Sequence, residues 1–220
     1  MGCAQAGDEG TVKLETLNEY QQAAWEFAVY PNAGSNLVYA ALGLGEVGEF
    51  QNQVKKVYRD DGGRVTEERR RAMLKELGDL MWYFAALCTE LDCKLGQVME
   101  SWVRMNMIGG HDLKLSVLSR YASCTGLIAH SLGAQALKLG CIGDIQITVH
   151  NNYLKYEVGS GESRSYIRGA ICVYIPEAVI IIERLADFLG SSLREVCESN
   201  IAKLKSRAED NQLHGDGDDR

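Results

Sequence analysis

Residues 41–58 read ALGLGEVGEFQNQVKKVY, and residues 136–153 read ALKLGCIGDIQITVHNNY. The two stretches share an opening Ala-Leu-x-Leu-Gly, a second glycine three residues later and a closing tyrosine at the same place. Farther along each half, KLGQVMES at 94–101 aligns with SLREVCES at 192–199. Because a repeated pattern predicts a repeated structural unit, these matches indicate two copies of one structural plan.

A third, looser match pairs LNEYQQ at 17–22 with LSRYAS at 118–123. Three matches in the same order favour an internal duplication, and we expect the two repeats to join near Gly109–Gly110. The sequence LHGDGDDR at its end is either a frayed end or a lid or subunit contact. We expect a flexible N-terminus, a first repeat, a second repeat and a polar tail, spanning residues 1–13, 14–109, 110–209 and 210–220.

Apolar residues recur at helical spacing along the first repeat and predict four helices. The expected helices span residues 14–29, 36–59, 66–92 and 95–107. DDGG at 60–63 interrupts the pattern, because glycine pairs favour turns. Thr66, followed by two glutamates, is typical of a helix N-terminus.

The second repeat contains two β-branched runs, DIQITVHN at 144–151 and AICVYIPEAVIII at 170–182. Taken alone, these runs read as strands. We interpret them as helices because they align with helical segments of the first repeat, and we expect a kink at Pro176. The sequence therefore predicts an all-α fold of two tandem helical bundles that form an intramolecular pseudo-dimer.

Composition excludes several classes of protein. The net charge of −7 lacks the surplus of Lys and Arg that a nucleic-acid groove requires. The seven cysteines are scattered without a C-x-x-C pair, which fits neither a disulfide framework nor a zinc site. No apolar run approaches the roughly 20 residues that span a bilayer, and no signal-peptide pattern is present. We expect a cytoplasmic protein without nucleic-acid or membrane partners.

Two pairs of acidic residues stand in apolar surroundings. Glu46 and Glu49 lie three residues apart, as do Glu76 and Asp79 within the apolar stretch 72–88. One such pair alone is usually a solvated helix face, but four facing carboxylates repel one another without a cation. Oxygen ligands favour Mg²⁺, or Mn²⁺ as a substitute. A di-iron site needs Glu-x-x-His motifs, which the four histidines do not supply.

GEVGE at 45–49 and ELGDLMWY at 76–83 resemble the E-x-x-E…E-x-x-D signature of the MazG-like nucleotide pyrophosphohydrolases. This family belongs to the all-α NTP pyrophosphatase superfamily. The resemblance covers residues 14–106 and 190–220 well and extends to the rest of the chain only through the internal repeat. It implies a helical bundle that pairs with a second copy.

The resemblance also implies an activity, the cleavage of a nucleoside triphosphate to its monophosphate and pyrophosphate with Mg²⁺. By resemblance, the metal ligands are Glu46, Glu49, Glu76 and Asp79. One of the glutamates, Glu49 or Glu76, orients or deprotonates the attacking water. The family further implies assembly into a homodimer.

Further substrate-binding candidates surround the acidic residues. The family uses the position of Tyr83 near the sugar or base, although a core tyrosine is an equal alternative. Trp25 is a candidate for base stacking or a buried tryptophan. Lys55, Lys56 and Arg59 either meet phosphates or form a solvated basic face.

The second repeat departs from the family pattern. Its residues aligned with the four acids are Cys141, Asp144, Tyr174 and Glu177. The first repeat in turn lacks counterparts of Asn200, Lys203 and Arg207, and Trp102 stands in place of Asn200. We hypothesise one composite site, with acids from the first repeat and closing polar residues from the second. The alternative is that the closing segment serves packing alone.

The sequence thus favours a Mg²⁺-dependent nucleoside triphosphate pyrophosphohydrolase that cleans the nucleotide pool. A narrower enzyme of the same superfamily, specific for dUTP, dCTP or phosphoribosyl-ATP, is a second interpretation. A nucleotide-sensing protein without catalysis is the third, and the intact acidic quartet of the first repeat disfavours it.

Overall fold

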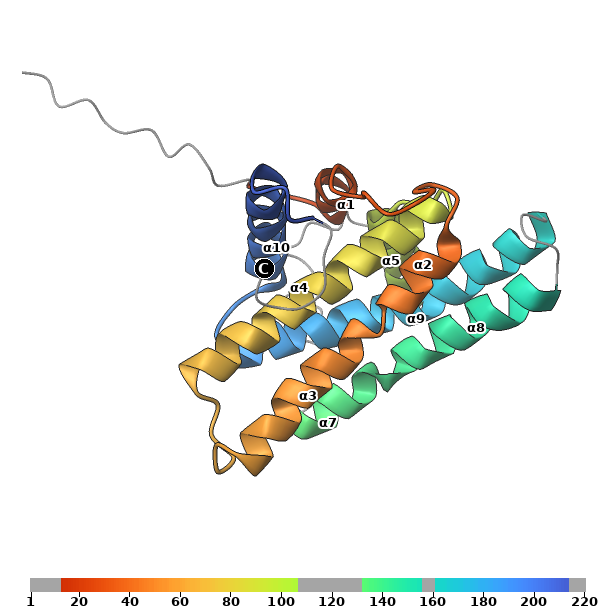
Figure 1. Cartoon of the computed structure of the whole chain (residues 1–220). Coiled ribbons are helices and arrows are strands. Elements are labelled where there is room, and N and C mark those ends of the chain that lie inside the picture. Colours follow the sequence, from red (N-terminus) through yellow and green to blue (C-terminus); the bar gives the residue numbers. More distant parts are fainter. Residues whose placement is uncertain (1–12, 107–131, 156–160, 214–220) are drawn as a thin grey trace, which may run out of the picture.

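The computed structural model describes residues 13–106, 132–155 and 161–213, and every regular element in these ranges is helical (Figure 1). The predicted all-α fold is confirmed. The first-half helices α1, α2, α3, α4 and α5 span Leu17–Trp25, Leu37–Gly43, Glu46–Arg59, Glu67–Glu90 and Leu95–Asn106. The second-half elements α7, η1 (a 3-10 turn), α8, α9 and α10 span Leu132–Lys138, Leu139–Cys141, Ile142–Lys155, Gly161–Phe188 and Leu193–Glu209.

The helix starts follow local capping chemistry. Thr16 and Glu19 form a capping box at α1, in which each side chain accepts a hydrogen bond from the backbone of the other. Thr66 caps α4 as predicted, since its hydroxyl accepts from the amide of Arg69 at 3.2 Å. The predicted turn at 60–63 is also present. Its two glycines, Gly62 and Gly63, have φ of 60° and 79°, in the left-handed region.

The single helix predicted over residues 36–59 is wrong, because the chain breaks into α2 and α3 at Leu44–Gly45. Around the break, the amides of Leu44, Gly45, Val47 and Gly48 bond to carbonyls three residues back instead of four. This tightened turn makes Glu46 the first residue of α3. Helical spacing alone did not reveal the break, because the apolar positions continue across it. The first helix is also shorter than expected and ends at Trp25.

The β-branched runs of the second half lie in α8 and α9, so their interpretation as helices is confirmed. Pro176 lies inside α9. The expected junction at Gly109–Gly110, the LSRYAS segment at 118–123 and the tail from residue 214 lie outside the described residues.

The two halves exchange their last helices in the packing. Within each half, α3 packs on α4 and α8 packs on α9. By contrast, α10 of the second half packs on α4, and α5 of the first half packs on α9. Figure 1 shows α7 and α8 running alongside α3 and α2 on one side of the long helices. Helices from both halves therefore surround each long helix.

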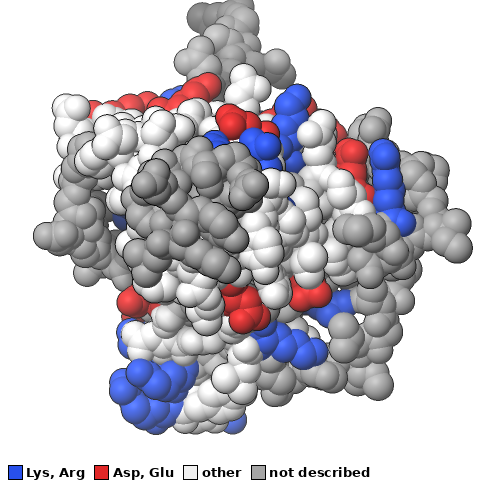
Figure 2. Space-filling view, turned by 90° about the vertical axis from the view of Figure 1, so that its right-hand side faces the viewer, with Lys and Arg blue, Asp and Glu red and all other residues white. Residues whose placement is uncertain are grey.

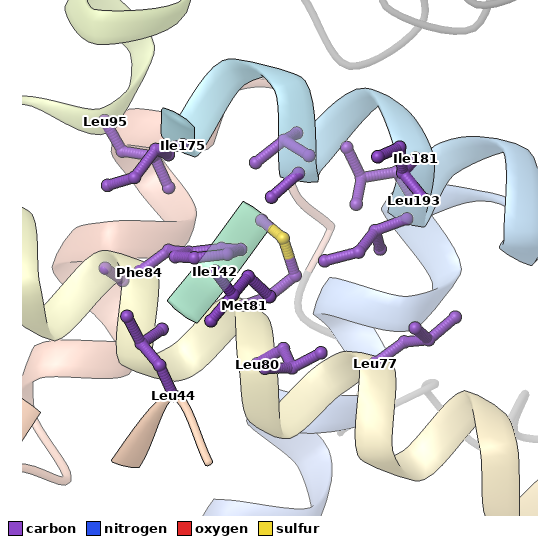
Figure 3. Close-up of a cluster of buried hydrophobic side chains, with 14 of the residues drawn as sticks. Leu44, Leu77, Leu80, Met81, Phe84, Leu95, Ile142, Ile175, Ile181 and Leu193 are labelled. Atoms are coloured by element: carbon purple, nitrogen blue, oxygen red, sulfur yellow. The ribbon is translucent and has the colours of Figure 1, made fainter. Parts of the chain in front are cut away.

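One hydrophobic core joins the halves. Figure 3 shows side chains of α4 and α9 meeting across it, with contributions from α5, α8 and α10. The labelled core residues are Leu44, Leu77, Leu80, Met81, Phe84, Leu95, Ile142, Ile175, Ile181 and Leu193. All are at most 9% exposed. Their burial stabilises the fold by roughly 1.5–3 kcal/mol for each large side chain.

The expectation that no apolar segment approaches membrane-spanning length was too strict for α9. By length and composition, Arg164–Phe188 is long and apolar enough to cross a membrane, with a mean hydropathy of 1.6. Half of the most apolar 18-residue stretch of this helix is buried inside the protein, as in the core helix of a folded domain. Such a helix is therefore weak support for a membrane segment.

Charged side chains are mixed on the face shown in Figure 2, where basic and acidic groups are interspersed among uncharged ones. Elsewhere in the molecule, charged side chains form local pairs, such as Arg59 with Asp60 and Arg70 with Glu67. Water screens pairs this exposed, so they add little to the stability of the fold.

Candidate functional site

Three of the four predicted metal ligands meet between α3 and α4. Glu46 begins α3, while Glu76 and Asp79 lie one turn apart on α4. One carboxylate oxygen from each lies within 4.8 Å of the others, and we call these three residues the acid trio. Glu76 is only 1% exposed, and the other two are half-buried. Three carboxylates this close repel one another unless cations lie nearby.

Glu49, the fourth predicted ligand, does not join the acid trio. Its side chain is exposed in the first turn of α3. Residues three apart are offset by about 60° around a helix, so Glu46 reaches α4 while Glu49 stays at the solvent edge. The positive end of the α3 dipole stabilises both carboxylates.

α10 brings two polar side chains to Asp79. Lys203 forms an ion pair with its Oδ1, and the amide of Asn200 donates to the same oxygen at 3.2 Å. The amide oxygen of Asn200 accepts in turn from the hydroxyl of Tyr20 on α1 at 2.9 Å. A Cβ at Gly78 would lie 3.1 Å from the Cβ of Asn200, so glycine at this position lets α10 approach α4 closely.

A group of cations surrounds this contact. Burial lowers the pKa of the Lys203 ammonium, Asp79 opposes that shift, and positive Arg207 and Lys75 add to it. Nε of Arg207 is buried and has no hydrogen-bond partner within the described ranges. The predicted closing residues Asn200 and Lys203 thus contact Asp79 of the acid trio directly. Arg207 lies close to Lys203, and we find no hydrogen bond or ion pair between Arg207 and Asp79 among the described residues.

Tyr83 lies one turn after Asp79 on α4, at the break between α2 and α3. Its ring occupies the space beside Gly43, where an added Cβ would lie 1.9 Å from the ring carbon Cε1. Burial, followed by Tyr39 and the carboxylates of Glu46 and Asp79, raises the pKa of the Tyr83 hydroxyl above its usual value. Tyr83 therefore stays a neutral donor beside the acid trio.

An aromatic cluster extends from Tyr83 toward α1. Tyr30 stacks on Tyr39 with ring centroids 4.2 Å apart, and Trp25 meets Tyr30 edge-on at 6.1 Å. Trp82 contacts both Tyr30 and Tyr83 edge-on. Trp25 is thus part of this cluster and contacts Tyr83 only through the other rings. Tyr39, which is 39% exposed, was not predicted from the sequence and presents the accessible ring of the cluster.

Glu90 is a second residue that sequence reasoning missed. It is 1% exposed and accepts hydrogen bonds from the Tyr30 hydroxyl and from the amides of Gly34 and Asn36. These bonds fasten the segment before α2 to the end of α4 and so fix the position of Tyr39. An acid closing an otherwise apolar helix was the available signal in the sequence.

The predicted basic candidates on α3 lie away from the acid trio. Lys55 and Arg59 are 9 and 13 residues after Glu46, or about 13 and 20 Å along the helix at ~1.5 Å per residue. Both are exposed, and Arg59 pairs with Asp60. Lys56 is half-buried on the same helix. This placement favours the solvated basic face over phosphate contact.

The second half shows no comparable group among the described residues. The acid trio is the one set of three potential ligands found in residues 13–106, 132–155 and 161–213. Asp144 and Glu177, which align with Glu49 and Asp79, are both exposed. Tyr174, aligned with Glu76, is half-buried against the hydrophobic core.

Comparison with known proteins finds a relative in a mycobacterial phage. The chain is 46% identical to the Gene 37 protein of Mycobacterium phage L5 over 87 residues, which cover 37% of this chain and 76% of the phage protein. The chain belongs to the family of this phage protein. No family model matches the chain, and no solved structure matches it. The name of the Gene 37 protein describes no activity, so the chemistry of the site must carry any functional argument.

The carboxylate oxygens of the acid trio in this chain fit a hard divalent cation. The acid trio offers carboxylate oxygens alone, from two helices, with one carboxylate fully buried. Mg²⁺ and Mn²⁺ prefer such oxygens and are commonly held by a few carboxylates together with substrate phosphates. Glu46, Glu76 and Asp79 would hold the ion, and Glu49 lies exposed at the edge of the group.

Proposed function

We propose that this chain is a MazG-like, Mg²⁺-dependent nucleoside triphosphate pyrophosphohydrolase with one composite site. The observation that carries the proposal is the meeting of the acid trio with Asn200 and Lys203 at Asp79. The acids come from the first half and the polar closing residues from the second. The exchange of α5 and α10 between the halves supports the intramolecular pseudo-dimer, because it gives one chain the helix pairing of two copies.

Each residue around the acid trio has its own role in the proposed reaction. Glu46, Glu76 and Asp79 would hold a divalent ion, which would supply positive charge to the phosphates and would lower the pKa of a water bound to it. Lys203 adds a positive charge for the phosphate chain, and Asn200 holds Asp79 in place. Glu49 or Glu76 orients or deprotonates the attacking water. Tyr39 and Tyr83 offer ring faces for the base.

The experiment is a pyrophosphate-release assay on a panel of ribo- and deoxyribonucleoside triphosphates, with Mg²⁺ or with a chelator. We expect release that needs the metal and that falls by at least about 10²-fold in Glu76→Gln, since changes one shell away from a metal already cost roughly 10–100-fold. The panel also ranks the bases, which separates a general enzyme from one specific for dUTP or dCTP.

The matched control is Asp144→Asn, which neutralises an exposed carboxylate of the second half. It should leave release unchanged. Circular dichroism of Glu76→Gln must match the parent, so that lost activity is not lost folding. Metal-independent release, or full release by folded Glu76→Gln, contradicts the proposal.

A nucleotide-binding protein without hydrolysis is the second candidate, favoured by one observation. Asp79 is already engaged by Lys203 and Asn200, which compete with a cation for the same carboxylate oxygen. In that case isothermal calorimetry detects nucleotide binding to the folded protein, while no triphosphate in the panel releases pyrophosphate.

A further inference from the structure

A pocket of about 290 Å³ opens between α4 and α10, beside the acid trio. It shares Gly78, Asn200 and Lys203 with the contacts around Asp79, so the pocket and the trio are neighbours. The pocket extends from there toward the start of α4, where Arg71 and Lys75 line it.

Three cationic side chains line this pocket together with apolar and neutral polar residues. Arg71 and Lys75 from α4 and Lys203 from α10 supply three positive charges, and Glu195 supplies one negative charge. The Glu195 carboxylate is occupied by the N-terminus of α10, because it accepts from the Ser191 hydroxyl at 2.7 Å and from the next backbone amide at 3.1 Å. Cations outnumber acids by three to one among the lining residues, although Lys203 is paired with Asp79, which does not line the pocket, and this balance suits a ligand with several negative charges.

Arg71 can change partners at low cost. Its guanidinium pairs with Glu67, but 75% of its side chain is exposed, so this pair adds little stability. Glu67 also pairs with Arg70 and would keep that partner. A phosphate offers the Arg71 guanidinium a stronger, bidentate contact.

The order of side chains along α4 gives the pocket a direction. Cations at Arg71 and Lys75 come first, the carboxylate of Asp79 follows, and the ring of Tyr83 comes last. These positions extend over 12 residues, or about 18 Å of helix. The aromatic cluster lies at one end of the acid trio and the cationic pocket at the other, so a bound nucleotide has one favourable orientation.

We propose that this pocket is the subsite for the pyrophosphate portion of the nucleotide, with Arg71 and Lys75 as binding residues. The inference rests on the proposed function and extends it to residues outside the MazG-like signature. The volume of the pocket supports its use by only part of the nucleotide. Sites for whole small molecules occupy about 300–1,000 Å³, and this pocket lies just below that range. The phosphate chain occupies the pocket, and the nucleoside lies toward Tyr83.

The test measures binding of inorganic pyrophosphate by isothermal titration calorimetry, in chelator and at low ionic strength. Without a divalent metal the acid trio only repels the anion, so the signal reports the cationic pocket. The variant is Arg71→Gln with Lys75→Gln. The matched control, Lys94→Gln with Lys205→Gln, removes two exposed positive charges that do not line the pocket.

We expect the parent and the control to bind pyrophosphate with similar affinity, and the pocket variant to bind roughly tenfold more weakly for each cation removed. Equal binding by the pocket variant and the control overturns the subsite. Absence of binding to the folded parent protein overturns it as well.

The same proteins in the pyrophosphate-release assay separate this inference from the proposed function. Pyrophosphate binding that depends on Arg71 and Lys75, without hydrolysis of any triphosphate, keeps the subsite and rejects the enzyme. Metal-dependent hydrolysis with unchanged KM and unchanged product inhibition in the pocket variant keeps the enzyme and rejects the subsite.

Discussion

The two long helices of the molecule, α4 and α9, receive a closing helix from opposite halves, yet the two contacts differ in chemistry. At α4, the polar side chains Asn200 and Lys203 of α10 meet Asp79. At α9, α5 contributes Trp102, which packs against the core, while Glu177 is exposed. The same helix packing therefore supports a charged site in one place and an apolar contact in the other.

The difference has a physical cause in the cost of burying charge. A carboxylate as buried as Glu76 costs several kcal/mol unless cations or donors compensate it. The second half replaces that position with Tyr174 and fills α9 with buried isoleucines, such as Ile171 and Ile175. Apolar packing at these positions adds stability, so a site kept in one half alone leaves the other half to stabilise the fold.

We expect the largest effect on pyrophosphate release from a change at Asp79, where α10 meets α4. Asp79→Asn should reduce metal-dependent pyrophosphate release by at least about 10²-fold, because it removes a ligand charge and the partner of Lys203. Glu177→Gln, the aligned change on α9, should change release less than about twofold because its carboxylate is exposed. Equal losses in the two variants would show that both halves contribute to catalysis.

The next effect concerns stability and should be shared by the two long helices. Phe84→Ala on α4 and Ile175→Ala on α9 both empty positions that are 0% exposed. We expect losses of about 3–5 and 2–5 kcal/mol in the free energy of unfolding. Urea titrations followed by circular dichroism and tryptophan fluorescence should coincide, since one core joins the halves. Two separate transitions would contradict the shared core.

We expect a smaller effect on stability from the hydrogen bond between Tyr20 and Asn200, at the polar contact of α10 with α4. Tyr20→Phe removes the hydroxyl that donates to Asn200, leaving the Asn200 oxygen with one partner fewer in a buried site. We expect a loss of about 1–3 kcal/mol in the free energy of unfolding near pH 7. Urea unfolding measures it, and Tyr166→Phe, at a residue that is 65% exposed, is the matched control.

The pH dependence of the same variant provides a second test. Burial, with Cys197 and Asp79, raises the pKa of the Tyr20 hydroxyl above its usual value. The folded state then holds a proton that the unfolded state loses near pH 10, so stability is complete below about pH 10 and declines above it. Tyr20→Phe should decline less steeply than the parent between pH 10 and 11. An unchanged slope would show that Tyr20 does not control this loss.

The smallest effect distinguishes the acid trio from the basic residues farther along α3. Lys56→Gln should change the KM of the triphosphate by less than about twofold, because Lys56 lies about 15 Å along α3 from Glu46 and is too far away to reach the same phosphates. Lys203→Gln should raise it by at least about tenfold through loss of a charged contact. Steady-state kinetics at fixed Mg²⁺ compares the two. A large effect of Lys56→Gln would restore the predicted phosphate contact from α3.

Local signals in the sequence anticipated much of the fold. The turn at 60–63, the cap at Thr66 and the helical state of residues 144–151 and 170–182 were all predicted correctly. The break at Leu44–Gly45 was not, because apolar spacing continues through it and the turn is fixed by contacts such as that of Tyr83 with Gly43.

The candidate site divides in the same way. The spacing of Glu76 and Asp79 in an apolar helix indicated a buried acidic pair, and sequence alone proposed that Asn200 and Lys203 complete it. The separation of Glu49 from the other acids, the aromatic cluster around Tyr39 and the cationic pocket beside α10 depend on how helices distant in sequence pack.

The sequence by itself determined that the described chain is helical and that the two acidic pairs in apolar surroundings lie in its first half, and it predicted that the two halves follow one plan. These properties follow from residue type and spacing, which act over one or two helical turns. Only the tertiary structure decided that α10 crosses onto α4 and that three carboxylates, not four, come together. The first depends on contacts between residues more than 100 positions apart, such as Lys203 with Asp79, and the second on Glu46 of α3 meeting Glu76 and Asp79 of α4, which local patterns do not encode.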